Sequence, residues 1–424
     1  MKSLFNNTPI IETVQDPLVK NSFFLMISTL TSSFSGFFFW MIVARYYPVQ
    51  DVGLAAAIIS PIVLISILSM MGFDISLIKY ISEVEEKKDL INTCFSVILI
   101  VSLILTLIFV AGIELWSPSL SIIKENRNIV LLFFVFSLVL PLQLLQSQGI
   151  FVGFRMTIFS FYQAIITLFR VLLPPMLVVY GSIGILVPYG LTPVLSFFAG
   201  TYYVKKIFPY SFELKINKNI LIKIFSFSSG NYLSRILETL PTFILPILVL
   251  NKLGAEANAY FYIAWQISML IIIFSKSISN SLFAELMLTK EDISELVKKS
   301  IKIMSTLLVC FIGGTFLFGK YVLLFFGSDY VVNSFSLLCL LVFASIPFSF
   351  NTIYVGIMRS RGDYLIAISV YGLTALLTLV GSFILMNNYG LLGVAYSWNI
   401  ANIASSIMII FMMFYARIKY IKSK

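Results

Sequence analysis

Residues 90–111 read LINTCFSVILIVSLILTLIFVA, a run in which no side chain is charged. A helix of about 20 such residues crosses a hydrocarbon layer roughly 30 Å thick. Working outward from this run, with Gly, Pro and charged residues as boundaries, we find eleven further segments of the same kind. We therefore predict an all-α integral membrane protein whose transmembrane helices lie near residues 19–44, 52–73, 90–111, 129–151, 156–180, 183–204, 219–250, 257–286, 298–319, 333–357, 364–387 and 391–416.

The composition agrees with this fold class. Hydrophobic residues make up 59% of the chain, charged residues 11%, and the mean hydropathy is +0.99, whereas soluble domains are roughly 45–50% apolar and about 25% charged. Lys and Arg outnumber Asp and Glu by 29 to 19. In a membrane protein such an excess is typical of cytoplasmic loops, so we expect no nucleic-acid partner.

The residue types that bind metals are scarce. Cys94, Cys310 and Cys339 stand apart inside apolar segments, and the chain has no histidine. Zinc and redox sites need paired cysteines or Cys/His clusters at characteristic spacings. We therefore predict no metal site and no cofactor.

The distribution of basic residues predicts the orientation. With the N-terminus inside, the cytoplasmic segments hold 21 Lys and Arg residues and the outside loops hold 5. Cytoplasmic loops retain basic residues, so both termini are expected in the cytoplasm. The first apolar run has no small-residue cleavage pattern, and we expect it to be kept as the first helix.

Two halves of the chain share residues at a nearly constant offset. One set is displaced by 207 positions (342 minus 135): Val135, Phe136, Gly149 and Ile150 match Val342, Phe343, Gly356 and Ile357. A second set is displaced by 209 (389 minus 180): Tyr180, Gly181 and Gly184 match Tyr389, Gly390 and Gly393. Such an offset, close to half the chain, indicates duplication. Because six helices per repeat is an even number, we predict a parallel repeat with lobes at 1–212 and 213–424, joined by the basic linker 205–218 and enclosing a central cavity.

Turns between the expected helices resemble those of a known family. The loop at residues 45–53, RYYPVQDVG, resembles the Leu-Gly-Pro-x-x-aromatic-Gly turn of the polysaccharide and O-antigen (Wzx-like) flippases, with Tyr46 and Tyr47 where that turn has Leu-Gly. The loop at 253–260, LGAEANAY, keeps the Leu-Gly opening. These flippases belong to the multidrug/oligosaccharidyl-lipid/polysaccharide exporter superfamily, which also contains multidrug and toxin extruders (MATE) and lipid II flippases. The resemblance implies a MATE-like fold and a transport function.

Four charged residues lie well away from the ends of predicted helices: Arg170, Arg235, Glu238 and Lys276. A charge at mid-helix costs about 2.5–3.5 kcal/mol on insertion scales and usually faces a cavity or a partner. Cations suit an anionic cargo, and a guanidinium binds phosphate bidentately, so we predict cargo binding by Arg170, Arg235 and Lys276. The alternatives are a structural pair between Arg235 and Glu238, three apart on one helix face, and snorkelling of Arg170 or Lys276 to an interface.

Glu238 has a second predicted role, because a buried carboxylate can bind H⁺ or Na⁺ and couple an ion gradient to transport. Pro241 and Pro246 interrupt the same helix, which makes it either a mobile gate or a static kink. Polar residues of the first helix are expected either to line the cavity or to pack closely against a neighbouring helix. They are Ser28, Thr29, Thr31, Ser32, Ser33 and Ser35.

The function expected from these features is transport, not catalysis. We predict a flippase of the cytoplasmic membrane that moves a polyprenyl-(pyro)phosphate-linked oligosaccharide by alternating access, with membrane lipids around it. The chain has no Walker-type glycine loop, so energy would come from an ion gradient or from consumption of the product outside. The alternative is an ion-coupled multidrug extruder of the same fold. A membrane enzyme such as a sugar polymerase would need a sizeable outside loop with acid-base residues, and the expected outside loops are short and lack histidine.

Overall fold

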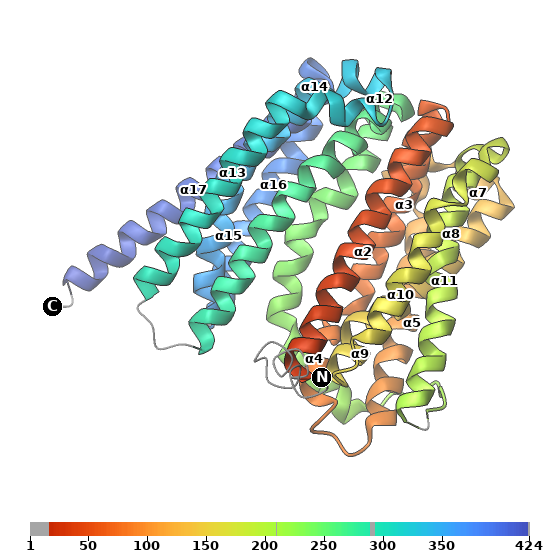
Figure 1. Cartoon of the computed structure of the whole chain (residues 1–424), viewed down its shortest axis with the longest axis vertical. Coiled ribbons are helices and arrows are strands. Elements are labelled where there is room, and N and C mark those ends of the chain that lie inside the picture. Colours follow the sequence, from red (N-terminus) through yellow and green to blue (C-terminus); the bar gives the residue numbers. More distant parts are fainter. Residues whose placement is uncertain (1–16, 209, 289–292, 423–424) are drawn as a thin grey trace, which may run out of the picture. The chain divides into compact units, whose positions relative to one another are not determined.

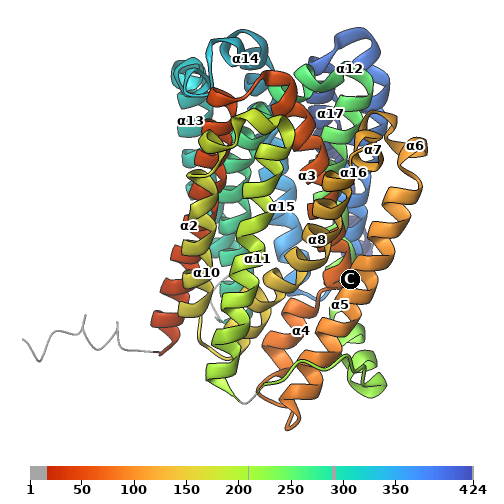
Figure 2. The ribbon, with the colours of Figure 1, turned by 90° about the vertical axis from the view of Figure 1, so that its right-hand side faces the viewer.

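The computed structural model describes residues 17–208, 210–288 and 293–422, and within these ranges every regular element is helical (Figures 1 and 2). Eleven of these helical segments are long and apolar enough to cross a membrane. The prediction of an all-α, multi-pass membrane protein is thereby confirmed.

Eleven segments are consistent with twelve expected helices because one segment contains two of them. Helix α12 (Lys218–Leu288) is 71 residues long. As a single rod it would measure about 105 Å at 1.5 Å per residue, several times the membrane thickness. Gly254 interrupts it with φ 89° and ψ 175°, a conformation that glycine reaches without a Cβ clash. Figure 1 shows the chain turning back there, between the expected helices 219–250 and 257–286.

The contacts divide the chain into two compact units. Unit 1 comprises Met1–Tyr47 and Pro61–Tyr232, and unit 2 comprises Pro48–Ser60 and Leu233–Lys424. Two helices belong in part to each unit, namely α3 (Val49–Met70) and α12.

Unit 1 is built around four long helices: α2 (Pro17–Tyr46), α5 (Lys87–Ala111), α8 (Arg127–Leu144) and α11 (Gly181–Ile207). Helix α10 (Ile158–Leu168) packs between α2 and α11, and α8 packs against both α5 and α11. The shorter elements are α4 (Phe73–Tyr80), α6 (Ile113–Trp116), η1 (Pro118–Leu120), α7 (Ile122–Glu125), η2 (Leu145–Ile150), α9 (Phe151–Gly153), η3 (Phe169–Val171), η4 (Pro174–Met176) and η5 (Val178–Tyr180).

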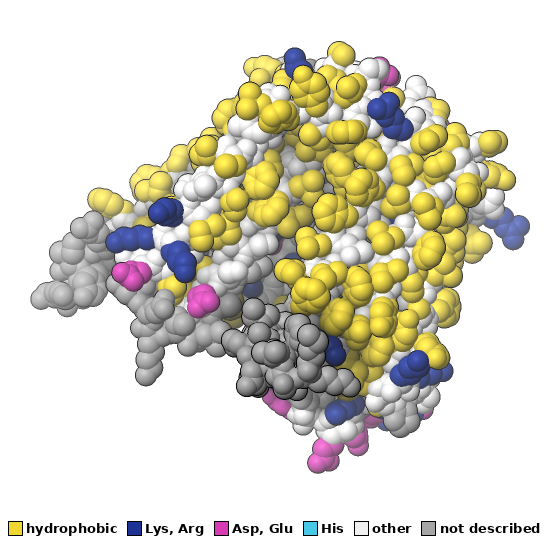
Figure 3. All heavy atoms as spheres, in the orientation of Figure 1, with side chains coloured by type: hydrophobic (Ala, Val, Ile, Leu, Met, Phe, Trp, Pro, Cys, Tyr) yellow, Lys and Arg dark blue, Asp and Glu magenta, His cyan; other side chains and the backbone are white. Residues whose placement is uncertain are grey.

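Helix α2 has an exposed apolar face and a second face that packs against the rest of unit 1. Its exposed side chains recur every three or four residues, as expected of one helix face, and are Phe23, Met26, Leu30, Phe34 and Phe38. On another face, the Ser28 hydroxyl donates to the Ser160 carbonyl at 3.2 Å and the Ser35 hydroxyl to the Thr167 carbonyl at 2.9 Å. Hydrophobic side chains likewise cover much of the face drawn in Figure 3. A surface of this kind suits contact with lipid.

Unit 2 contains α12 from Leu233 onward and five further helices. These are α13 (Ile293–Leu324), α14 (Ser328–Phe343), α15 (Ser345–Ser360), α16 (Tyr364–Tyr389) and α17 (Leu391–Lys422). Helices α16 and α17 form an extensively packed pair, and α17 also contacts α14 and α15. The chain turns between α16 and α17 at Gly390.

Two matched turns support the expected duplication. Gly181 ends η5 with φ 55° and ψ −136°, and Gly390 ends α16 with φ 53° and ψ −135°. This backbone region is essentially restricted to glycine, so the same tight turn occurs at positions 209 apart (390 minus 181). The observation is consistent with the predicted repeat of two six-helix lobes.

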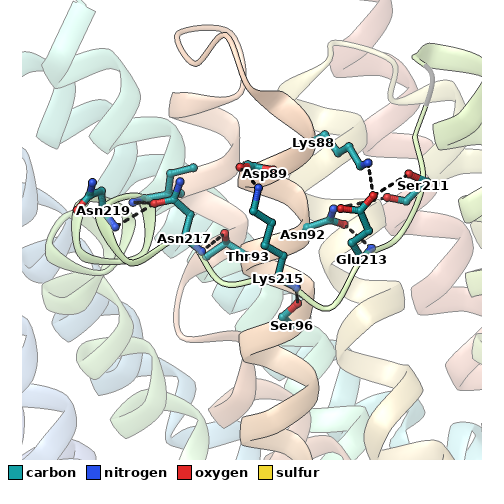
Figure 4. Close-up of polar contacts among 11 residues, drawn as sticks. Lys88, Asp89, Asn92, Thr93, Ser96, Ser211, Glu213, Lys215, Asn217 and Asn219 are labelled. Atoms are coloured by element: carbon teal, nitrogen blue, oxygen red, sulfur yellow. Dashed lines mark hydrogen bonds and ion pairs between the residues drawn. The ribbon is translucent and has the colours of Figure 1, made fainter.

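The segment between the two expected lobes is bound to unit 1. Residues 210–217, which we call the strap, run along α5 and are drawn in Figure 4. Side chains of α5 accept hydrogen bonds from strap N–H groups: Thr93 Oγ1 from Asn217 at 3.0 Å and Ser96 Oγ from Lys215 at 3.1 Å. Asn92 Oδ1 accepts from the Tyr210 hydroxyl at 2.8 Å. These three residues of α5 are fully buried polar side chains, and the strap explains their presence in an apolar helix.

Ion pairs reinforce the strap. Lys215 Nζ lies 2.8 Å from Asp89 Oδ2, and Lys88 donates to the Glu213 carboxylate. The hydrogen bond and the charge of Lys88 lower the pKa of Glu213, and the hydrogen bond and charge of Asp89 raise the pKa of Lys215. Burial raises the pKa of Tyr210. The basic linker expected at 205–218 is therefore structured along residues 210–217.

The boundary between the units differs from the expected lobe boundary at 212/213 in two places. Residues 213–232 join unit 1 through the strap and through α12, where the Ser228 hydroxyl donates to the Met71 carbonyl at 3.0 Å. Residues 48–60 join unit 2, where Asn258 Nδ2 donates to the Gly53 carbonyl at 2.7 Å. The two units are defined by contacts, whereas the lobes at 1–212 and 213–424 are predicted from the repeat in the sequence. The lobes therefore remain a prediction.

Candidate functional site

Unit 1 encloses a polar cavity of about 400 Å³, a size typical of small-molecule sites. Helices α2, α8, α10 and α11 form its wall together with η2 and η3. Most lining side chains carry a hydroxyl, an amide or a guanidinium: Ser28, Thr29, Ser32, Ser33, Gln143, Ser147, Gln148, Ser160, Gln163, Thr167, Arg170 and Tyr189. None of the described residues that line it is acidic.

Arg170 is the one cation among the residues described as lining this cavity. Its Nε donates to Ser35 Oγ at 2.8 Å, and Nη2 donates to the Ser32 carbonyl at 3.1 Å. The guanidinium carbon also lies 5.7 Å from the ring centre of Tyr189 and 6.0 Å from that of Phe39. These contacts restrain the guanidinium, and a cation in an acid-free wall attracts anions.

A π-helical turn shapes the wall next to Arg170. Element η2 (Leu145–Ile150) continues α8 with the wider hydrogen bonding of a π-helix, a feature that often occurs at functional sites. Gln143 precedes the turn and Gln148 lies within it, and both line the cavity. The Ser160 hydroxyl of α10 donates to the Ser147 carbonyl at 2.7 Å, which fixes the turn against α10.

Gln163, which also lines the cavity, is linked to a further amide behind it, that of Gln146. The amides of Gln146 and Gln163 contact each other at 3.0 Å, and Gln146 contacts the Thr201 hydroxyl at 3.0 Å. Gln163 Nε2 donates to the Ser196 carbonyl at 3.0 Å. A Cβ at Gly200 would stand 2.2 Å from both amides, so a glycine is needed for this network to form.

Unit 2 has a much smaller pocket, of about 10 Å³, which is room for about one water molecule. Its polar lining residues are Glu238, Asn351, Tyr371, Thr374, Trp398 and Asn402, and Pro241 also contributes. Asn402 Oδ1 is buried and has no hydrogen-bond partner among the described residues. Lys276 Nζ pairs with Glu238 Oε1 at 2.8 Å, and the two side chains are 36% and 18% exposed.

The four predicted charged residues thus lie in two different places. Arg170 lies in the unit 1 cavity, whereas Arg235, Glu238 and Lys276 lie in the unit 2 part of α12. Glu238 pairs with Lys276, which comes from the other arm of α12. The pair of Arg235 and Glu238 that their spacing offered as an alternative remains a prediction. The roles proposed for all four residues, and the gate at Pro241 and Pro246, remain predictions.

Residues 18–284 match the family described as "Polysaccharide biosynthesis protein". The chain belongs to this family. The resemblance predicted from the turns is thereby confirmed. A curated protein gives a second likeness. The chain is 26% identical over 227 residues to a protein of Shigella flexneri described as "Putative O-antigen transporter". The match covers 51% of this chain and 52% of that protein, so the chain spans about half the length of this curated relative.

Solved structures with the same fold include two kinds of transporter. A structure described as "Lipid II flippase MurJ, inward closed conformation" aligns with a TM-score of 0.70 and 16% identity over 92% of this chain and 87% of that chain. An outward-facing MATE multidrug resistance transporter aligns with a TM-score of 0.60 and 17% identity over 96% of each chain. At these identities the likeness concerns the fold, and it confirms the MATE-like architecture predicted for this family member.

Gln143, Gln148 and Tyr189, which line the unit 1 cavity, were not identified from the sequence. A signal was present, because residues 140–150, LPLQLLQSQGI, place three amides in an otherwise apolar helix. For the polar residues of the first helix the sequence leaves two alternatives, cavity lining and close packing. Ser28, Thr29, Ser32 and Ser33 line the unit 1 cavity, and Ser28 also bonds to the neighbouring helix α10.

Proposed function

We propose that this protein is a flippase that moves a polyprenyl-(pyro)phosphate-linked oligosaccharide from the cytoplasmic to the outer leaflet of the cytoplasmic membrane, by alternating access and for surface polysaccharide biosynthesis. Family membership supports this proposal, as do the description of the Shigella flexneri relative as an O-antigen transporter and the fold shared with a lipid II flippase. The excess of basic residues in the expected inside loops supports cytoplasmic termini.

The observation that carries the proposal is the chemistry of the unit 1 cavity. Arg170 supplies a restrained cation, which suits the phosphate of a lipid carrier. The remaining polar wall consists of hydroxyls and amides, which suit the hydroxyls of sugars. A single cargo that has an anionic phosphate and a neutral polyol matches both parts of the wall.

The same wall disfavours the alternative cargo class. An extruder of cationic drugs needs carboxylates at its binding surface to neutralise the cargo. The described lining of the unit 1 cavity has a cation and no acid, so a cationic drug would meet repulsion there. This contrast favours the flippase over the ion-coupled multidrug extruder.

Glu238 is the residue we propose for coupling to H⁺ or Na⁺. Its pocket has room for one water molecule or one small cation, and Asn402 Oδ1 provides a buried acceptor there. The ion pair with Lys276 gives this carboxylate two alternative partners, an ammonium group or a bound ion. Arg235 and Lys276 remain candidates for cargo contact, although Lys276 would first have to leave Glu238.

Reconstitution tests the proposed function directly. Proteoliposomes would be loaded with the diphosphate-linked oligosaccharide lipids extracted from the source cells, and their accessibility in each leaflet would be followed. We expect transfer above that of protein-free liposomes, loss of transfer in Arg170→Ala, and normal transfer in Arg127→Ala, which removes an exposed arginine of unit 1.

Two results would contradict the proposal. Absence of transfer by the folded intact protein, combined with ion-driven export of a cationic dye, would replace the flippase by the multidrug extruder. Full transfer by Arg170→Ala would remove the unit 1 cavity from the cargo pathway.

A further inference from the structure

Two amides of the unit 1 cavity have no partner within the described part of the chain. Gln143 is only 7% exposed and Gln148 is exposed, and neither side chain has a hydrogen-bond partner among the described residues. Both line the cavity. By contrast, the neighbouring amides Gln146 and Gln163 are hydrogen-bonded to protein groups. The cavity lining therefore contains two amides that bond to no described residue. Beside them, Gln163 donates to protein groups, although its buried Oε1 has no partner among the described residues.

The local backbone accounts for this placement. In a regular α-helix, residues five apart point about 140° away from each other, at 3.6 residues per turn. The π turn of η2 begins after Gln143 and includes Gln148. Its smaller rotation per residue reduces the angle between the two side chains and brings them nearer to one helix face. The backbone thus deviates from α-helical geometry at the place where two unpartnered amides line one cavity.

The chemistry of a primary amide points to the kind of group it would bind. Each amide offers two N–H donors and a carbonyl acceptor. An apolar ligand would displace water from these amides and leave them without a partner, which is unfavourable. A ligand that donates and accepts would therefore be bound in preference to an apolar one. Sugar hydroxyls both donate and accept, whereas a polyprenyl chain does neither.

From this placement and chemistry we infer that Gln143 and Gln148 form a sugar-binding subsite of the unit 1 cavity, separate in role from the phosphate contact of Arg170. The inference rests on the proposed flippase function and assigns the sugar and the phosphate of the cargo to different side chains. The two amides recognise the glycan, and the guanidinium recognises the phosphate common to every lipid carrier of this kind. The subsite therefore discriminates between cargo with and without sugar.

The test compares two cargoes in the same proteoliposomes. One is the extracted oligosaccharide diphosphate lipid, and the other is the polyprenyl diphosphate without sugar. Leucine nearly preserves the volume of glutamine and removes its hydrogen bonds, so the variants are Gln143→Leu, Gln148→Leu and the double variant. We expect each single variant to slow transfer of the sugar-bearing lipid roughly ten-fold, as for loss of one hydrogen bond to the sugar, and to leave the bare lipid unaffected.

A matched control is Gln266→Leu, which removes a partly buried glutamine of unit 2 that lies outside the lining of both pockets. Equal slowing of both lipids, or no slowing of either, in folded Gln143→Leu and Gln148→Leu proteins would overturn the sugar subsite while leaving the flippase intact. Failure of the intact protein to move the sugar-bearing lipid would instead overturn the proposed function itself. Binding of the free, lipid-less oligosaccharide to the purified protein, lost in the double variant, provides a second measurement that does not depend on transfer.

Discussion

The polar sites of unit 1 and unit 2 differ in size, in charge and in how their polar groups are satisfied. The unit 1 cavity is about 400 Å³, is lined by Arg170 without a described acid, and exposes two unpartnered amides. The unit 2 pocket is about 10 Å³ and contains Glu238, whose charge is compensated by Lys276. The two units therefore contain polar sites of different kinds: one has the size of a small-molecule site, and the other has room for about one water molecule.

The largest expected effect comes from the cation of unit 1. Arg170→Ala removes the one cation described in the cavity lining and, with it, the charge-assisted hydrogen bonds that we propose to the cargo phosphate. Each such bond is worth about 1.5–3 kcal/mol, so transfer of the lipid-linked oligosaccharide should fall about 100-fold or more. Arg170→Lys keeps the charge but loses bidentate geometry, and should retain part of the rate. Transfer rates in proteoliposomes measure both. If Glu238→Gln abolished cargo binding while Arg170→Ala did not, the assignment of the two sites would be reversed.

A second prediction concerns the packing that supports the unit 1 wall. Gly200→Ala places a Cβ 2.2 Å from the amides of Gln146 and Gln163, so the network must shift, at a cost of about 1–3 kcal/mol. We expect a clear drop in the thermal unfolding temperature of the detergent-solubilised protein. The matched control is Gly372→Ala in unit 2, where the nearest atom would be an ordinary 3.6 Å away. Equal unfolding temperatures for the two variants would mean that the amide network contributes little.

The ion pair of unit 2 should have a smaller and more specific effect. Because both side chains are partly exposed, the Lys276–Glu238 interaction is expected to contribute about 1 kcal/mol or less to stability, as measured by a double-mutant cycle with Glu238→Gln and Lys276→Met. The more informative measurement is the dependence of transfer on Na⁺ and pH. Glu238→Gln should remove that dependence while leaving binding of the cargo unchanged. A dependence that survives in Glu238→Gln would place the coupling group elsewhere.

The smallest effect is expected at the strap, which lies outside both sites. The pKa of Glu213 is lowered from 4.5, so its contribution is present above pH 4.5 and is lost as the pH falls through the lower folded value. The pKa of Lys215 is raised from 10.5, so its contribution is present below pH 10.5 and is lost as the pH rises through the higher folded value. A spin label at Ser211 should therefore be least mobile between these limits.

Two variants separate the ion pairs from the backbone contacts of the strap. Lys88→Ala with Asp89→Ala should flatten the pH dependence of the spin label but leave the strap ordered, because Thr93 and Ser96 still accept strap N–H groups. Thr93→Val with Ser96→Ala should increase mobility at every pH. A label that is equally mobile in the intact protein and in both variants would show that the strap is not bound to α5 in solution.

The amino-acid sequence alone was sufficient for the fold class, the family and the approximate positions of most helices. The helix expected at 156–180 is an exception, because its α-helical part ends at Leu168 and the short turns η3, η4 and η5 follow, two of them at or near Pro174 and Pro175. Hydropathy is a local property, so a run such as 90–111 predicts a membrane helix without knowledge of its neighbours. The turns at 45–53 and 253–260 likewise carry their resemblance within a few residues. Arg170 could be recognised as a site candidate because a charge is rare in an apolar helix.

Only the tertiary structure decided which of these residues meet. The partners Arg170 and Ser35 are 135 residues apart, and Thr93 and Asn217 are 124 apart, so no local pattern could predict either contact. The pairing of Glu238 with Lys276 depends on the reversal of α12 at Gly254, and the two cavity amides depend on the π turn of η2. Periodicity places side chains on the faces of ideal helices, whereas turns, bulges and the packing of distant segments determine which faces come together.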